Sequence, residues 1–124
     1  MEFIEAPAFA RHLPDHLNDD EYQELQARLG SNPELGDVMP GTGGFRKVRW
    51  ADVRRGKGRR GGLRIIYYYF RSDHQIWLMT LYGKGEASDL TAGEKKALKA
   101  SIESELEARA ARRIVGLRRP RRTQ

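Results

Sequence analysis

The sequence predicts a single domain of the α+β class. Two central segments, LRIIYYYF at 63–70 and QIWLMTLY at 75–82, are almost continuously apolar and rich in β-branched and aromatic residues, which is typical of strands covered on both faces. Segments with helical spacing and capping residues flank them. The 124 residues suffice for one domain but not for two. We therefore expect the order β-α-α-β-β-β-α, an antiparallel sheet with two N-terminal helices and one C-terminal helix.

The N-terminal third predicts one strand and two helices. MEFIE alternates apolar and polar residues, as a short strand does. Pro7 suits the first turn of a short helix, which we expect Pro14 to end. Asn18 is a good N-cap for a second helix, and the acidic residues after it favour the positive end of the helix dipole. This helix should stop near Gly30, and 31–44 should form a loop.

The remaining elements are three strands and a closing helix. In FRKVRWADV, Val48 and Trp50 fall on one face, and Lys47 and Arg49 on the other. The two apolar runs follow as strands. Thr91 begins a T-x-x-E capping box, and the closing helix after it carries an apolar stripe at 98, 102 and 106. The folded domain should span 1–111, and residues 112–124 should form a basic, disordered tail.

Charge is strongly segregated along the chain, whose net charge is +6. Residues 1–45 contain two basic and nine acidic residues, whereas 46–64 contain nine basic residues and one acid. The last thirteen residues contain six arginines and no acid. This segregation indicates a polyanion or an acidic protein as partner.

Several classes of protein do not fit the sequence. The absence of cysteine excludes disulfides, thiolate metal sites and a cysteine nucleophile. The N-terminus lacks the basic segment of a signal peptide, and no apolar stretch approaches the roughly 20 residues that span a bilayer. We therefore expect a soluble, cytoplasmic protein that does not associate with membranes.

Two motifs have weak functional readings. GKGRRG at 56–61 matches G-x-G-x-x-G, but a strand follows it instead of a helix, so it does not indicate a dinucleotide site. Its cations, Lys57, Arg59 and Arg60, would instead make a basic hairpin attractive to phosphate. His12, His16 and His74 have no nearby carboxylate pattern that would complete a metal site, so we expect no metal.

A set of basic residues around the strands is more suggestive of function. Lys47 and Arg49 share a strand face, Arg64 begins an apolar strand where a charge should reach the rim of the sheet, and Lys84 follows the third strand between glycines. With Arg46, these side chains could converge on one surface if the strands are neighbours. An ordinary basic sheet face is an equal alternative.

Three segments resemble the HigB-type branch of the RelE/ParE toxins. They are PGTGGFRKVRW, RRGGLRIIYYYF and IWLMTLYGKGEASDLTAGE, and the resemblance covers about residues 1–106. It implies a RelE-like fold, similar to microbial RNases, whose sheet face accepts messenger RNA in the ribosomal A site. RelE-like members cleave RNA without a metal, through attack of the ribose 2′-OH on its own phosphate. ParE relatives share the fold but poison DNA gyrase.

The resemblance also implies roles for the basic residues. Lys47, Arg64 and Lys84 would be catalytic: Lys47 as a phosphate ligand and candidate base, Arg64 stabilising the transition state, and Lys84 protonating the leaving group or stabilising charge. Tyr82 is expected in the core. The expected RNA-binding residues are Arg46, Arg49, Lys57, Arg59 and Arg60, with no metal and no cofactor.

The implied partners are the ribosome, messenger RNA and a cognate helix-turn-helix antitoxin similar to HigA. The arginine-rich tail would add a non-specific anchor to RNA or the ribosome. Two rival functions stay open at this point, a gyrase-poisoning toxin and an RNA-binding module without enzymatic activity.

Overall fold

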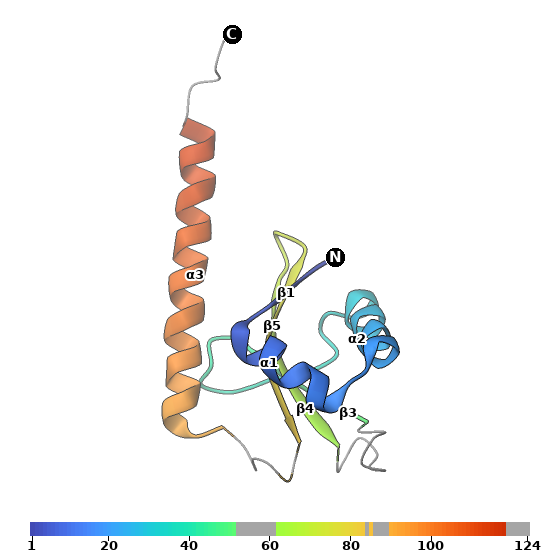
Figure 1. Ribbon diagram of the computed structural model, residues 1–124. Coiled ribbons are helices and arrows are strands. Elements are labelled where there is room, and N and C mark those ends of the chain that lie inside the picture. The colour runs from blue at the N-terminus through green and yellow to red at the C-terminus, as the bar shows by residue number, and fades with distance from the viewer. Residues whose placement is uncertain (52–61, 84, 86–89, 119–124) are drawn as a thin grey trace.

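The computed structural model describes residues 1–51, 62–83, 85 and 90–118, and within them it shows a five-stranded sheet with three helices (Figure 1). This α+β architecture has the predicted order of elements and is consistent with a RelE-like fold. One short strand is additional. The elements in chain order are β1 (Glu2–Glu5), α1 (Pro7–His16), α2 (Asp19–Ser31), β2 (Asp37–Val38), β3 (Arg46–Trp50), β4 (Leu63–Phe70), β5 (Gln75–Gly83) and α3 (Ala92–Arg118).

The strands lie in the order β1-β5-β4-β3-β2. β3, β4 and β5 are antiparallel neighbours, as predicted. β2 also pairs antiparallel, with β3. β1, however, pairs parallel with β5, so the expectation of a purely antiparallel sheet is wrong and the sheet is mixed. The register shifts between the pairs Ile66–Thr80 and Tyr67–Leu78, so Met79 is the extra residue of a β-bulge in β5.

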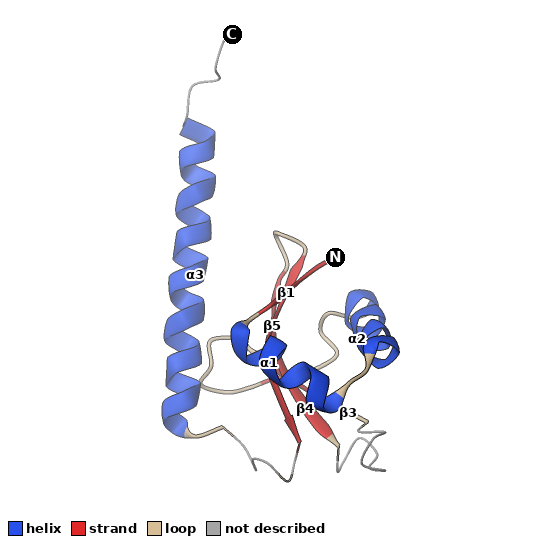
Figure 2. Cartoon of the chain, viewed as in Figure 1, coloured by secondary structure: helices blue, strands red, loops and turns tan. Residues whose placement is uncertain are grey.

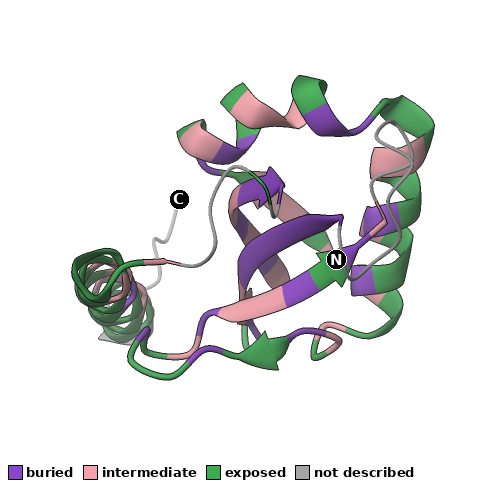
Figure 3. Ribbon diagram, turned by 90° about the horizontal axis from the view of Figure 1, so that it is seen from below, coloured by how far each residue is buried: buried purple, intermediate pink, exposed green. Residues whose placement is uncertain are grey.

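Each face of the sheet has its own apolar cluster, because side chains alternate along a strand. Val48 and Trp50 contribute to the first cluster, together with residues of α1 and α2 such as Phe9 and Leu25. The second cluster lies on the opposite face and joins Ile66 to Phe45 and to Ile102 of α3. Figures 2 and 3 show α1 and α2 on one side of the sheet and α3 on the other. Both faces are therefore covered, which explains the almost continuous apolar runs of β4 and β5.

The N-terminal helices differ from the prediction at one point. Pro14 does not end the first helix: α1 continues through it to His16. The proline ring removes one backbone hydrogen bond. Because Pro14 lies in the last turn of α1, little of the helix depends on that bond. α2 begins as predicted, with a capping box in which Asn18 and Glu21 exchange two hydrogen bonds of 2.8 Å.

The loop that precedes β3 is shaped by Thr42 and its neighbouring glycines. The Thr42 hydroxyl donates to the carbonyl of Met39 at 2.7 Å and accepts from the amide of Phe45 at 3.1 Å. Gly43 has a φ of +78°, and a Cβ on it would lie 2.9 Å from Ile102 Cγ2. This glycine therefore allows α3 to approach the loop closely.

α3 is longer than predicted. It begins with the expected capping box, in which Glu94 accepts from the amide of Thr91 at 2.8 Å and the Thr91 hydroxyl accepts from the amide of Glu94 at 3.1 Å. It continues to Arg118, and Figure 1 shows its last turns beyond the turn that joins β4 to β5. The expectation of a disordered tail is therefore wrong for residues 112–118, while residues 119–124 lie outside the described part of the chain.

Candidate nucleic-acid interface

Arg49, Arg64 and Tyr82 form one row across three strands. Arg49 on β3 is the register partner of Arg64 on β4, and Arg64 is in turn the partner of Tyr82 on β5. Directly opposite residues of antiparallel strands project from the same face, with Cα atoms about 5 Å apart. The two arginines therefore lie side by side on the face that α3 partly covers.

A second row lies next to the first on the same face. Lys47 is the register partner of Ile66, and Ile66 is the partner of Thr80. The two rows form a grid of six residues, which we call the cation grid: Arg49, Arg64 and Tyr82, then Lys47, Ile66 and Thr80. Ile66 is fully buried at the centre of the second row. The grid thus has three cations at one side and hydroxyl groups at the other.

Arg64 is unusual because its side chain is buried, with 8% of the residue exposed. It is the second residue of β4 and so lies at the end of the strand, as predicted, but it does not reach into solvent. Its Nη1 donates to the carbonyl of Leu63 at 3.3 Å. A charge removed from water interacts more strongly with an anion that reaches it. Arg64 is accordingly the residue of the grid best suited to bind a phosphate tightly.

Lys47 is half-buried and Arg49 is exposed. The register of the short strand β2 places Asp37 opposite Lys47. This carboxylate was not expected beside the cations, because a two-residue strand within a loop has no periodicity that a sequence pattern could reveal. It adds a carboxylate, which can accept a proton, next to Lys47.

Arg46 does not join the cation grid. Arg46, Val48 and Trp50 are alternate residues of β3, so Arg46 lies on the face of the sheet away from the cation grid. Its Nη1 donates to the carbonyl of Gly36 at 2.8 Å. A longer hydrogen bond of 3.4 Å reaches the carbonyl of Glu34, and an ion pair of 3.6 Å reaches its carboxylate. These contacts hold the segment before β2 against the sheet. Tyr82 packs in the second apolar cluster, which confirms its predicted place in the core.

The remaining predicted site residues lie outside the described part of the chain. They are Lys57, Arg59, Arg60 and Lys84. The described residues at which their segments join the sheet are close together, because Trp50 and Gly83 are both register partners of Leu63. Both segments therefore join the sheet at the end that carries Arg49 and Arg64.

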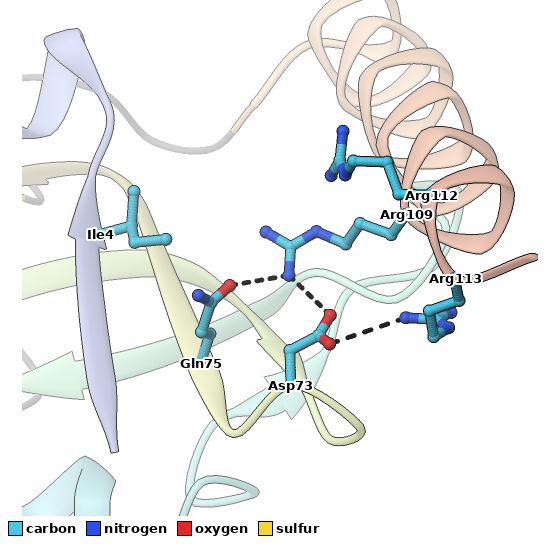
Figure 4. A pocket seen from close by; sticks show the side chains of 6 residues that line it. All are labelled: Ile4, Asp73, Gln75, Arg109, Arg112 and Arg113. Carbon is cyan, nitrogen blue, oxygen red and sulfur yellow. Dashed lines mark hydrogen bonds and ion pairs between the residues drawn. The ribbon is translucent and has the colours of Figure 1, made fainter. Parts of the chain in front are cut away.

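A second group of arginines lies at the far end of α3 (Figure 4). Arg109 donates to Asp73 at 2.8 Å, to Gln75 at 2.7 Å and to Glu105 at 2.7 Å. Its guanidinium also lies 3.7 Å from the centre of the Phe70 ring. Burial lowers the pKa of Arg109, but the hydrogen bonds and charges of Asp73 and Glu105 outweigh burial and raise it above its usual value. Arg109 therefore fastens α3 to the β4–β5 turn.

A hollow of about 480 Å³ surrounds this contact, and Arg112 and Arg113 line it. Arg112 pairs with Glu105 at 3.4 Å, and Arg113 pairs with Asp73 at 3.6 Å. Along the helix axis, Arg112 lies about 30 Å from the start of α3. The basic end of α3 contacts Asp73 and Gln75, at the opposite end of β4 and β5 from Arg64, and is thus remote from the cation grid.

The described residues contain no cluster of three or more histidine, aspartate or glutamate side chains that could hold a metal ion. Within the same residues, no helix has both the length and the apolar composition needed to cross a membrane. No protein-family model matches the sequence.

Proposed function

We propose that this chain is the toxin of a type II toxin–antitoxin system, a ribosome-dependent endoribonuclease that cleaves messenger RNA. The proposal rests on the cation grid, and above all on the opposition of Arg49 and Arg64. Two guanidinium groups that oppose each other on one face of a sheet can bind the same anion. The phosphates of RNA are such anions, and each guanidinium fork can bind two of their oxygens.

The proposed cleavage is a transesterification within the RNA. The ribose 2′ oxygen attacks the adjacent phosphorus, the bond from phosphorus to the 5′ oxygen of the next nucleotide breaks, and a 2′,3′-cyclic phosphate and a 5′-hydroxyl result. One group removes the 2′ proton and another protonates the leaving 5′ oxygen. The phosphorane between these steps carries two negative charges, which preorganised cations stabilise.

The residues of the grid divide these tasks. Arg64, buried and held by the sheet, binds the phosphorane oxygens. Arg49, which is exposed, positions the phosphate before reaction. Lys47 and Asp37 are the candidates for accepting the 2′ proton. Lys84, which lies outside the described residues, is assigned from the sequence to the leaving 5′ oxygen.

The test is cleavage of a messenger RNA by the purified protein with and without ribosomes, read by primer extension. Arg64→Met keeps much of the side-chain volume and removes the charge, and we expect it to lower the cleavage rate by about 10²–10³-fold. Arg71→Met is the matched control, because Arg71 is 78% exposed at the opposite end of β4. Circular dichroism should show both variants folded.

Three results would contradict the proposal. Equal cleavage rates for Arg64→Met and wild type would show that the cation grid takes no part in catalysis. Growth arrest with an SOS response and intact transcripts would indicate a gyrase poison. RNA binding without any cleaved product, with ribosomes present, would indicate a binding module.

The proposed partner is a helix-turn-helix antitoxin encoded beside the toxin gene. An acidic segment laid over the cation grid would neutralise it. A second surface is acidic: Asp19 and Asp20 are exposed at the start of α2, on the other side of the sheet. Co-expression with the neighbouring gene should yield a tight complex and relieve growth arrest. Purification of the toxin alone, with growth still arrested, would contradict this part of the proposal.

A further inference from the structure

An apolar groove of about 510 Å³ lies beside the cation grid. Its floor includes Met79 and Thr80 of β5, and its walls come from the start of α1 and the first half of α3. Thr80 is itself a member of the grid and lies one row from Tyr82. From strand spacing and rise, the Cα atoms of Thr80 and Arg64 are about 8 Å apart. A phosphate bound at Arg64 therefore places the next part of an RNA chain at the groove.

The groove has the composition of a small-molecule site, with mostly apolar walls and a few polar groups. Leu90, Ala97 and Leu98 provide apolar surface, and Thr80, Ser101 and Glu94 provide the polar groups. The hydroxyls of Thr80 and Ser101 make no hydrogen bond with another described residue. They are available to a ligand that has a flat apolar body and a polar edge.

We propose that this groove binds one nucleobase of the RNA, next to the phosphate held by Arg49 and Arg64. The proposal rests on the proposed function for the identity of the ligand. Single-stranded RNA is read by bases turned out of the stack, which present an apolar face and a hydrogen-bonding edge. The apolar walls match the face, and the polar groups match the edge.

Glu94 determines which bases fit. One of its carboxylate oxygens accepts from the amide of Thr91, and the carboxylate can only accept hydrogen bonds when ionised. The other oxygen can accept from a base that carries an exocyclic amino group at this edge, as adenine and cytosine do. Uracil presents a carbonyl at the corresponding position and meets repulsion. The groove therefore disfavours uracil.

The test uses 2′-O-methyl hexanucleotides that differ only in one base, because methylation removes the attacking hydroxyl and isolates binding. Fluorescence anisotropy should show wild type binding the cytosine form about tenfold more tightly than the uracil form. Glu94→Gln retains the helix cap, since glutamine also serves at this position, but adds an amide donor. It should bring the two affinities to within about twofold. Glu103→Gln, on an exposed position of the same helix outside the groove, should keep the preference.

A second pair of variants tests occupation of the groove. Ala97→Trp fills it and should weaken binding of every hexanucleotide by about tenfold, whereas Ala100→Trp, also exposed on α3 but outside the groove, should not. Unchanged base preference in Glu94→Gln, unchanged affinity in Ala97→Trp, or no binding by wild type would each overturn the inference. If the protein binds the hexanucleotides with base selectivity but does not cut unmethylated RNA on ribosomes, the proposed nuclease function is wrong and the inference about the groove is retained.

Discussion

Replacing Arg49 by glutamine should make the protein more stable and less active. Arg49 and Arg64 are register partners on one face of the sheet, and like charges in that arrangement disfavour the folded state. Arg49 is exposed, and its removal leaves no buried cavity. Glutamine keeps part of the side chain but has no charge to repel Arg64. The same loss removes a ligand for the phosphate.

The size of the effect follows from the geometry. Opposed like charges in a sheet cost about 0.2–1 kcal/mol. At about 2.1 cal/mol/K per residue, unfolding of 124 residues carries an entropy near 260 cal/mol/K. The melting temperature should therefore rise by about 1–4 °C. A hydrogen bond to a charged group contributes about 1.5–3 kcal/mol, so RNA cleavage should fall by roughly tenfold to a hundredfold.

The assay is thermal unfolding followed by circular dichroism at low ionic strength and in 1 M salt. In 1 M salt the screening length is about 3 Å, which is shorter than the separation of the two strands' Cα atoms, so the gain in stability should shrink. Arg71→Gln is the control: it breaks an exposed ion pair of 2.8 Å with Glu34 and should lower stability slightly. A variant no more stable than wild type at low salt would refute the reasoning, as would a gain that persists undiminished in 1 M salt.

Two further predictions concern α3. Arg109→Met should destabilise the docked helix by about 2 kcal/mol, because it leaves Asp73 and Glu105 without a mostly buried partner. Hydrogen exchange should rise in α3 after Glu105, whereas the exposed Arg112→Met should change little, and equal exchange in the two variants would contradict this role. Removing residues 112–124 should leave the fold intact and reduce the salt dependence of ribosome binding, because six arginines then release no counterions. If the truncated protein binds ribosomes with an unchanged salt dependence, the segment contributes to solubility and not to RNA binding.

The strands of the grid could be predicted because 46–50 alternates in polarity and the two strands after it are almost continuously apolar. Alternation over 46–50 placed Lys47 and Arg49 on one face, and the structure confirms that placement. The same alternation assigns Arg46 to the face of Val48. The sequence pattern alone therefore predicts that Arg46 lies away from the cation grid. Asp37 could not be found in this way, because β2 has only two residues and forms by pairing with a distant strand.

The ends of the helices were less predictable, for a physical reason. Pro14 disfavours helix locally, but it lies near the end of α1, and buried Phe9 and His16 hold the helix against the sheet. The arginine-rich segment after 111 has no apolar periodicity, and its Arg113 pairs with Asp73, which is far away in sequence. Such long-range contacts do not appear in a local pattern.

The position of α3 connects the two halves of the proposed site. Its first half forms one wall of the groove, and Ile102 seats it against the loop at Gly43, where a side chain would come within 2.9 Å of Ile102 Cγ2. Ile102 also packs in the same cluster as Ile66 and Tyr82, the residues that separate the cations from the groove. The close approach at Gly43 therefore sets the width of the groove and the packing beneath the grid together. Cations fixed on strands and a wall fixed by a glycine contact form a preorganised surface, which is what tight binding of a phosphate and its neighbouring base requires.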